Sequence, residues 1–278
     1  RVMVDEIPFS VEKARLFTES YRRNEGMPEI IRTATAQAYV LDHFPVFIIE
    51  DELIAGNQAA KEMAVEADFW SKGTWTSESI ESLRAEKWGI SDEQAELMYE
   101  LSAYWRNIIM DYKALDLYDE ELWAWKRCGF LLPPCETVEQ AAGNGFACNG
   151  FGLFGDAEVN QIDYGYVMKK GIGAIIKEAE EELHVMMKNS MGSGEEIEKI
   201  YFLKAVIIIQ KAFVRFAKRF ASLAEKEAVG CGDAKRRKEL ERMAKACQQV
   251  PENPPRTFYE AVQFQWFLFL MLVTRNTT

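Results

Sequence analysis

The sequence has few of the residues from which metal sites and disulfide frameworks are built. Its 278 residues include two histidines, His43 and His184, and five cysteines, none of them in a C-x-x-C pair. Two histidines are too few for a histidine-based metal cluster, and the cysteine spacing argues against a zinc or iron–sulfur site. An odd number of cysteines in a chain of this size favours reduced thiols over disulfides. We therefore expect no bound metal.

Long apolar runs and an excess of basic residues are also missing. The longest apolar run, residues 264–273, is shorter than the roughly 18 residues of a membrane-spanning helix and suits a buried helix or strand. Acidic residues outnumber basic ones by 44 to 33, for a net charge of -11. This charge argues against non-specific binding to nucleic acid or anionic membranes. We expect a cytoplasmic protein without either partner, and the abrupt ends predict that it is part of a longer chain.

Apolar residues recur at helical spacing along most of the chain and predict a mostly α-helical fold with few strands. On the longest expected helix, Phe202, Phe216 and Phe220 fall on the face that we expect to be buried. Another expected helix opens at Ser91. That longest helix is expected over residues 195–228, and the remaining helices over residues 10–25, 30–43, 166–187 and 234–249.

Two shorter regions predict something other than helix. Residues 46–49 and 53–56 are β-rich runs on either side of an acidic turn, which predicts a hairpin or paired extended segments. Residues 57–90 carry scattered tryptophans among polar residues, and we expect an irregular segment there.

Residues 128–165 form the most glycine-rich part of the chain. Within them, Gly150-x-Gly152-x-x-Gly155 matches the dinucleotide-binding pattern. That pattern has its mechanism only after a buried strand and before a helix, and no such unit surrounds it. The aromatic residues of the loop favour a cavity wall instead. Cys128 and Cys148 flank the loop without a histidine near in sequence, so we expect small buried thiols rather than nucleophiles.

Four stretches resemble the pyruvate formate-lyase-like glycyl radical enzymes, in the branch of diol dehydratases, choline lyase, hydroxyproline dehydratase and arylacetate decarboxylases. Each stretch is a weak signal alone, but their order and spacing match the family along almost the whole chain. They are ARLFTESY at 14–21 with GMP at 26–28, IIEDELIAGNQ at 48–58, DYGYVMKKGI at 163–172, and spaced matches from Arg237 to Gln263.

The resemblance implies a ten-stranded barrel of two half-barrels wrapped by helices. Residues 1–278 would form the amino-terminal part of that domain, with the barrel beginning near residues 258–278. The family's thiyl-forming cysteine lies in a G-C-x-x-P-type loop and its radical glycine near the carboxyl end; neither loop occurs here. The catalytic half is therefore expected to be absent and the fragment inactive.

The resemblance also implies partners. A separate radical S-adenosylmethionine activating enzyme would install the glycyl radical, and the enzyme itself would bind no other cofactor. The substrate would be a small organic molecule. Family members are commonly homodimers, so a homodimer is a possible assembly.

Several residues match the family's substrate pocket. Two pocket side chains, eight residues apart before the D-Y motif, correspond to Phe151 and Val159. Dehydratases and choline lyase tend to have His or Asp at the second position, and an apolar Val159 cannot satisfy a buried hydroxyl, at a cost of about 1–3 kcal/mol. This favours an apolar or aromatic substrate. A small insertion would instead bring Asp156 or Asn160 to that place, and a dehydratase then fits.

Two further pocket candidates, Arg275 and Asn276, follow what resembles a first barrel strand beyond Trp266. Two other classes of function remain open. One is a catalytically inert helical scaffold, and the other is a nucleotide-binding enzyme that uses the Gly150–Gly155 loop.

Overall fold

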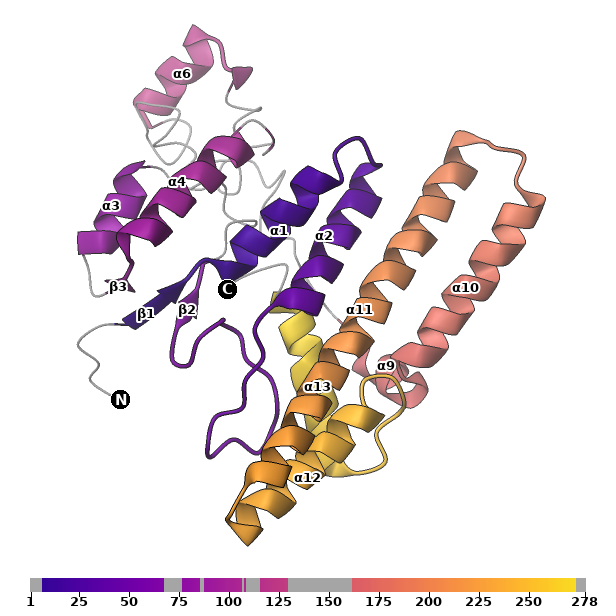
Figure 1. Cartoon of the computed structure of the whole chain (residues 1–278). Coiled ribbons are helices and arrows are strands. Elements are labelled where there is room, and N and C mark those ends of the chain that lie inside the picture. Colours follow the sequence, from indigo (N-terminus) through magenta and orange to yellow (C-terminus); the bar gives the residue numbers. More distant parts are fainter. Residues whose placement is uncertain are drawn as a thin grey trace. The chain divides into compact units, whose positions relative to one another are not determined.

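The computed structural model describes residues 7–67, 77–85, 88–106, 108, 116–129 and 162–273 (Figure 1). The chain divides into two compact units, one from residues 1–15 and 63–161 and the other from residues 16–62 and 162–276. Each unit is described by itself. The elements are β1 (Ile7–Ser10), α1 (Glu12–Arg23), α2 (Glu29–His43), β2 (Val65–Glu66), α3 (Ser77–Ala85), β3 (Trp88–Gly89), α4 (Asp92–Arg106), α6 (Glu120–Arg127), α9 (Tyr164–Lys170), α10 (Ile172–Asn189), α11 (Gly194–Gly230), α12 (Ala234–Gln249) and α13 (Phe258–Val273).

The first unit contains a small parallel sheet in the order β2-β1-β3. Phe9 pairs with Val65 on one side, and Ile7 pairs with Trp88 on the other. Phe9 also belongs to a buried apolar cluster with Ile80 of α3 and Met98 of α4. The prediction of an irregular segment over residues 57–90 is therefore wrong where α3, β2 and β3 form. Strands this short gain their stability from partners distant in sequence, which local patterns do not show.

The second unit is built around α11, which packs against α2, α10 and α12. Its core is aromatic and alanine-rich, because small alanines let neighbouring helices approach while phenylalanines fill the remaining volume. Phe216 and Phe220 meet edge to face with ring centroids 5.1 Å apart, and Phe267 of α13 lies 5.9 Å from Phe220. The predicted burial of Phe216 and Phe220 is thus confirmed.

The capping chemistry of α11 explains where this long helix begins. The Ser193 hydroxyl accepts a hydrogen bond from the Glu196 N–H, and the Glu196 carboxylate accepts one from the Ser193 N–H, which is a capping box. These hydrogen bonds hold the pKa of Glu196 below its usual range. The predicted burial of Phe202 is wrong: its side chain is 57% exposed, because the described elements leave this side of α11 open to solvent.

Three other expectations need correction. Residues 46–49 and 53–56 form no strand, although a turn does occur at Glu50 and Asp51. The strand expected beyond Trp266 is wrong as far as Val273, because α13 is helical there. The single helix expected over residues 166–187 is two, α9 and α10, separated at Gly171. Long apolar runs do not by themselves distinguish helix from strand.

The described residues are mostly helical with few strands, as the spacing of apolar residues predicts, and the strands form one small parallel sheet. Among them, no helix combines the length and the apolar character needed to cross a membrane.

Candidate functional site

The predicted substrate-pocket residues lie outside the described part of the chain. The Gly150–Gly155 loop also falls there, so its assignment to a cavity wall stays a prediction. The pocket residues concerned are Phe151, Asp156, Val159, Asn160, Arg275 and Asn276.

The described neighbours of these candidates share one core. Ile162, which follows the first group in sequence, and Met271, which precedes the second, both pack against the apolar cluster of the second unit. Asp163 then fixes the start of α9, because its carboxylate accepts a hydrogen bond of 2.9 Å from the Tyr166 N–H. The core of the second unit therefore anchors the chain directly beside both groups of candidates.

One face of α13 binds an extended segment through side-chain hydrogen bonds. The Gln263 amide bonds both backbone groups of Ala55, donating to its carbonyl and accepting from its N–H, each at 2.8 Å. Trp266 Nε1 donates to the Gly56 carbonyl at 3.1 Å, and the Tyr259 hydroxyl donates to the Leu53 carbonyl. Residues 53–56 have no neighbouring strand, and side chains of α13 form the hydrogen bonds to their backbone that such a strand would form.

Burial makes this junction costly to disturb. Gln263 and Ala55 are both fully buried, and a buried backbone group without a partner costs about 1–3 kcal/mol. Gly56 has φ +132°, where side chains are rarely tolerated, and a Cβ there would lie 2.7 Å from Trp266 Nε1. Both the glycine and the glutamine are therefore required for the close approach of this segment to α13.

A second junction fixes the start of α10. The N–H groups of Ile172 and Gly173 would be unpaired in an isolated helix, but they donate to the carbonyls of Pro251 and Glu252 at 2.8 Å each. Gly171 has φ +75°, and a Cβ on it would lie 2.7 Å from the Glu252 carbonyl oxygen. The residues that follow α12 therefore cap α10 and leave no room for a side chain at Gly171.

Arg236 forms a third junction, at the acidic turn. Its guanidinium donates to the carbonyls of Ile49 and Glu52 at 2.9 and 2.7 Å. The Glu52 carboxylate also accepts a hydrogen bond of 2.9 Å from the Ile49 N–H. Burial raises the pKa of Glu52, while that hydrogen bond and the charge of Arg236 act in the opposite direction. These contacts stabilise the turn without the strand pairing that the sequence suggested.

These junctions bring together three stretches that resemble the family, at residues 48–58, 163–172 and 237–263. The contact between Gln263 and Ala55 joins residues 208 positions apart. Sequence reasoning missed it, since no local pattern links an amide side chain to a backbone segment so far away. The described arrangement can support a pocket wall, but it contains no nucleophile of its own.

Two further kinds of candidate site are metal-binding clusters and reactive thiols. Among the described residues, no group of histidines, cysteines and carboxylates could hold a metal ion. Cys247 is buried, and burial raises the pKa of its thiol, which keeps it uncharged and unreactive. Cys128 is exposed, so the prediction of a buried thiol is wrong there; Cys148 lies outside the described residues.

Comparison with known proteins identifies the family. The pyruvate formate lyase-like family matches residues 2–278, and the chain belongs to that family. Isethionate sulfite-lyase from Oleidesulfovibrio alaskensis is 32% identical over 266 residues, which cover 92% of this chain and 30% of the relative.

Solved structures agree. The glycerol-bound B12-independent glycerol dehydratase from Clostridium butyricum is 28% identical, with a TM-score of 0.79 over 98% of this chain and 32% of that one. A glycyl radical enzyme from Archaeoglobus fulgidus is 26% identical, with a TM-score of 0.76 over 97% of this chain and 32% of that one. The resemblance to glycyl radical enzymes is confirmed, and the chain spans about a third of the length of these relatives.

Proposed function

We propose that these residues are part of an anaerobic glycyl radical lyase that cleaves a C–C or C–X bond of a small organic substrate. The observation that carries the proposal is similarity along the whole chain. The pyruvate formate lyase-like family matches residues 2–278, and the glycerol dehydratase structure matches 98% of the chain. The relatives named above are a lyase, a dehydratase and a glycyl radical enzyme. The reaction would be of the dehydratase or decarboxylase type.

The radical centre would lie in the part of the enzyme outside these residues. A separate radical S-adenosylmethionine activating enzyme would abstract a hydrogen atom from the radical glycine, and a cysteine would then pass the radical to the substrate. No metal would be needed in the mature enzyme. The protein would work in the cytoplasm and would assemble as a homodimer.

The described residues would contribute positioning and exclusion of water. A thiyl radical must face one substrate C–H bond. A closed pocket both orients the substrate and excludes water from the radical. The α13 junction with residues 53–56 and the capped start of α10 anchor the chain beside both groups of pocket candidates. These contacts would keep the pocket wall rigid during turnover.

The substrate class depends on the residue that faces the reacting bond. Val159 supports an apolar or aromatic substrate beside Phe151. The names of isethionate sulfite-lyase and glycerol dehydratase refer to small polar substrates, which Asp156 or Asn160 would suit better. We favour the apolar substrate slightly, on the strength of Val159.

Electron paramagnetic resonance tests the radical chemistry. The full-length protein, activated without oxygen by its activating enzyme, should show a glycyl doublet. The inert scaffold would be favoured if the complete sequence lacked both the G-C-x-x-P-type cysteine loop and the R-V-x-G-Y-like motif of the radical glycine, and if no doublet appeared.

Turnover tests the substrate class, and calorimetry tests the remaining alternative. Activated enzyme should act on arylacetates; activity on glycerol, isethionate or choline alone would show that the apolar assignment is wrong. Nucleotides should produce no binding heat. Affinity tighter than millimolar that is lost on replacing Gly152 would support the nucleotide-binding alternative.

A further inference from the structure

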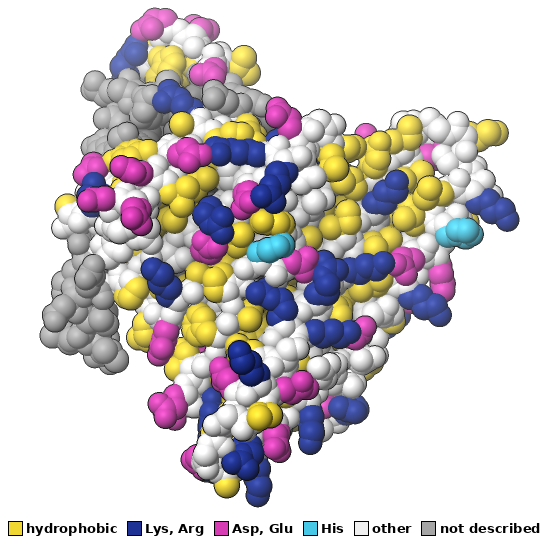
Figure 2. Space-filling view, viewed as in Figure 1, with side chains coloured by type: hydrophobic (Ala, Val, Ile, Leu, Met, Phe, Trp, Pro, Cys, Tyr) yellow, Lys and Arg dark blue, Asp and Glu magenta, His cyan; other side chains and the backbone are white. Residues whose placement is uncertain are grey.

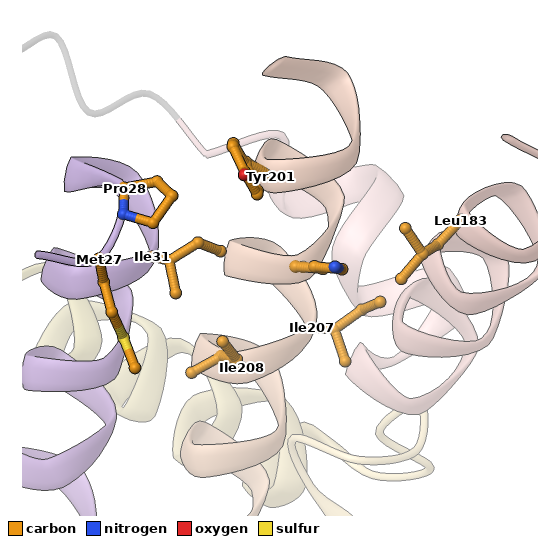
Figure 3. Close-up of a pocket in the computed structure, with 8 residues that line it drawn as sticks. Met27, Pro28, Ile31, Leu183, Tyr201, Ile207 and Ile208 are labelled. Atoms are coloured by element: carbon orange, nitrogen blue, oxygen red, sulfur yellow. The ribbon is translucent and has the colours of Figure 1, made fainter. Parts of the chain in front are cut away.

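An open groove runs along α11 between α2 and α10 (Figure 3). Its floor is formed by α11, and its walls come from the start of α2 and from α10. The groove has a volume of about 390 Å³. Its lining is almost wholly apolar and includes Met27, Ile31, Leu183, Ile207 and Ile208.

Lys204 is the one charged residue among those that line this apolar groove. The neighbouring lysines on α11 have carboxylate partners. Lys199 pairs with Glu195 of the same helix at 2.6 Å, while Lys211 pairs with Glu180 and Lys218 with Glu252, each at 2.6 Å. In the part of the chain that the structure describes, no carboxylate pairs with Lys204 in this way. The groove therefore offers an apolar floor and one cation without a carboxylate partner.

Apolar surface continues beyond the groove. Ile30 is 41% exposed and Met187 59%, and Figure 2 shows hydrophobic side chains gathered towards the turn where α10 meets α11. Large exposed apolar patches mark interaction surfaces for proteins or grooves for ligands. About two thirds of the length of the relatives lies outside what this chain covers, since it spans 30% of one and 32% of another.

We propose that the groove receives an amphipathic helix from the part of the same polypeptide outside these 278 residues, with a carboxylate on its apolar face paired to Lys204. A helix laid between two others buries its apolar face in this way, with anchors every three or four residues. The charge pair sets the register of the incoming helix, because a carboxylate elsewhere on that face would be desolvated without a partner. The inference rests on the proposed function only in taking the chain as part of a longer enzyme.

Zero-length crosslinking tests the charge pair. The full-length protein, made as an equal mixture of ¹⁴N- and ¹⁵N-labelled chains, is treated with carbodiimide and digested for mass spectrometry. The expected product is an amide between Lys204 and an Asp or Glu outside these residues, with both peptides carrying the same label. The pair of Lys199 and Glu195, 2.6 Å apart, is the internal positive control. Lys204→Arg should abolish the first crosslink and leave the control unchanged.

Three outcomes would overturn the proposal. Mixed labels in the Lys204 crosslink would make the occupant a second copy. A Lys204 crosslink confined to residues 1–278 would place its partner within this part of the chain. Formation of the Lys199 crosslink without any at Lys204 would show that no carboxylate approaches it.

Methionine oxidation tests the apolar floor without any variant. Met27 is 46% exposed and Met191 94% exposed in this structure, and oxidation follows exposure. In the full-length protein, the covering helix should lower the oxidation rate of Met27 to about one tenth of that of Met191 or less, at every protein concentration. A ratio near one half, as the exposures here give, would overturn the proposal, and so would protection lost on dilution. Neither measurement depends on a glycyl radical, so this inference and the proposed chemistry fail separately.

Discussion

The two halves of α11 show how one continuous helix can serve as both core and binding surface. In residues 211–230, three phenylalanines are buried, and basic side chains on the outer face bridge to neighbouring elements. In residues 194–210, all of which the structure describes, Ala205 is the one buried side chain. The backbone hydrogen bonds of a helix are satisfied within the helix itself. The two halves therefore differ in how much of their surface other elements of the fold bury.

The largest expected effect is on core packing. Phe220→Ala removes a fully buried ring from the second half and should cost about 3–5 kcal/mol in the free energy of unfolding. The matched change Phe202→Ala, in the first half, should cost less than about 0.5 kcal/mol if the ring stays in water. Urea unfolding of the purified protein measures both. A cost above about 1 kcal/mol for Phe202→Ala would show that the first half is covered too.

Two glutamines give the next effect. Gln263→Leu leaves both backbone groups of Ala55 unpaired and should cost about 2–6 kcal/mol, since each such group costs about 1–3 kcal/mol. Gln210, at the end of the first half, is the control, because its buried Oε1 has no hydrogen-bond partner among the described residues. Gln210→Leu should be neutral or stabilising in the same urea experiment. Equal costs would contradict the assignment of the α13 junction.

Substituting two glycines at opposite ends of α10 separates the effect of close packing from the effect of backbone strain. Gly171 and Gly192 have φ of +75° and +81°, but a Cβ on Gly192 would meet no atom within 4 Å. Alanine at either position should incur backbone strain of about 1–3 kcal/mol. Gly171→Ala should additionally displace residues 251–253 and lower the melting temperature more than Gly192→Ala. Similar melting temperatures would mean that the start of α10 is loosely held.

The smallest effect concerns exposed charges. Lys211→Met removes the bridge to Glu180 and should cost about 0–1 kcal/mol, because exposed ion pairs contribute little and are screened by salt. When no helix occupies the groove, Lys204→Met should leave the free energy of unfolding unchanged. Unfolding midpoints at low and high ionic strength measure the difference, which should shrink as salt rises. A loss of stability with Lys204→Met alone would indicate a carboxylate already bound there.

The long helices could be predicted from the sequence because their stability is local and periodic. The spacing of apolar residues predicted α2, α11 and α12 to within about two residues of their observed ends, and the start of α4 to within one residue. It failed for β1, whose pairing partners lie far along the chain, and at residues 46–49, where Arg236 and Glu52 stabilise a turn in place of a ladder. It also failed at Phe202, since periodicity shows which face is apolar but not how far the cover extends.

The candidate site was less accessible to sequence reasoning. The family stretches could be recognised, but the contacts that join them depend on three-dimensional proximity between segments such as 53–56 and 259–270. Gly171 shows the same limit: it matches the family motif, yet the reason for a glycine is the Glu252 carbonyl oxygen, 81 residues away in the chain. The assignments of Phe151, Val159 and the other pocket residues stay predictions.

The bond between Gln263 and Ala55 also has a consequence for biosynthesis. The second unit is assembled from residues 16–62 and 162–276, so its first piece leaves the ribosome long before its second. Translation proceeds at about 5–20 residues per second, and the 208 residues between Ala55 and Gln263 therefore take about 10–40 s. During that interval the nascent residues 53–56 lack the side chains that satisfy them. A chaperone that binds short extended peptides would find its longest-lived target in this part of the nascent chain.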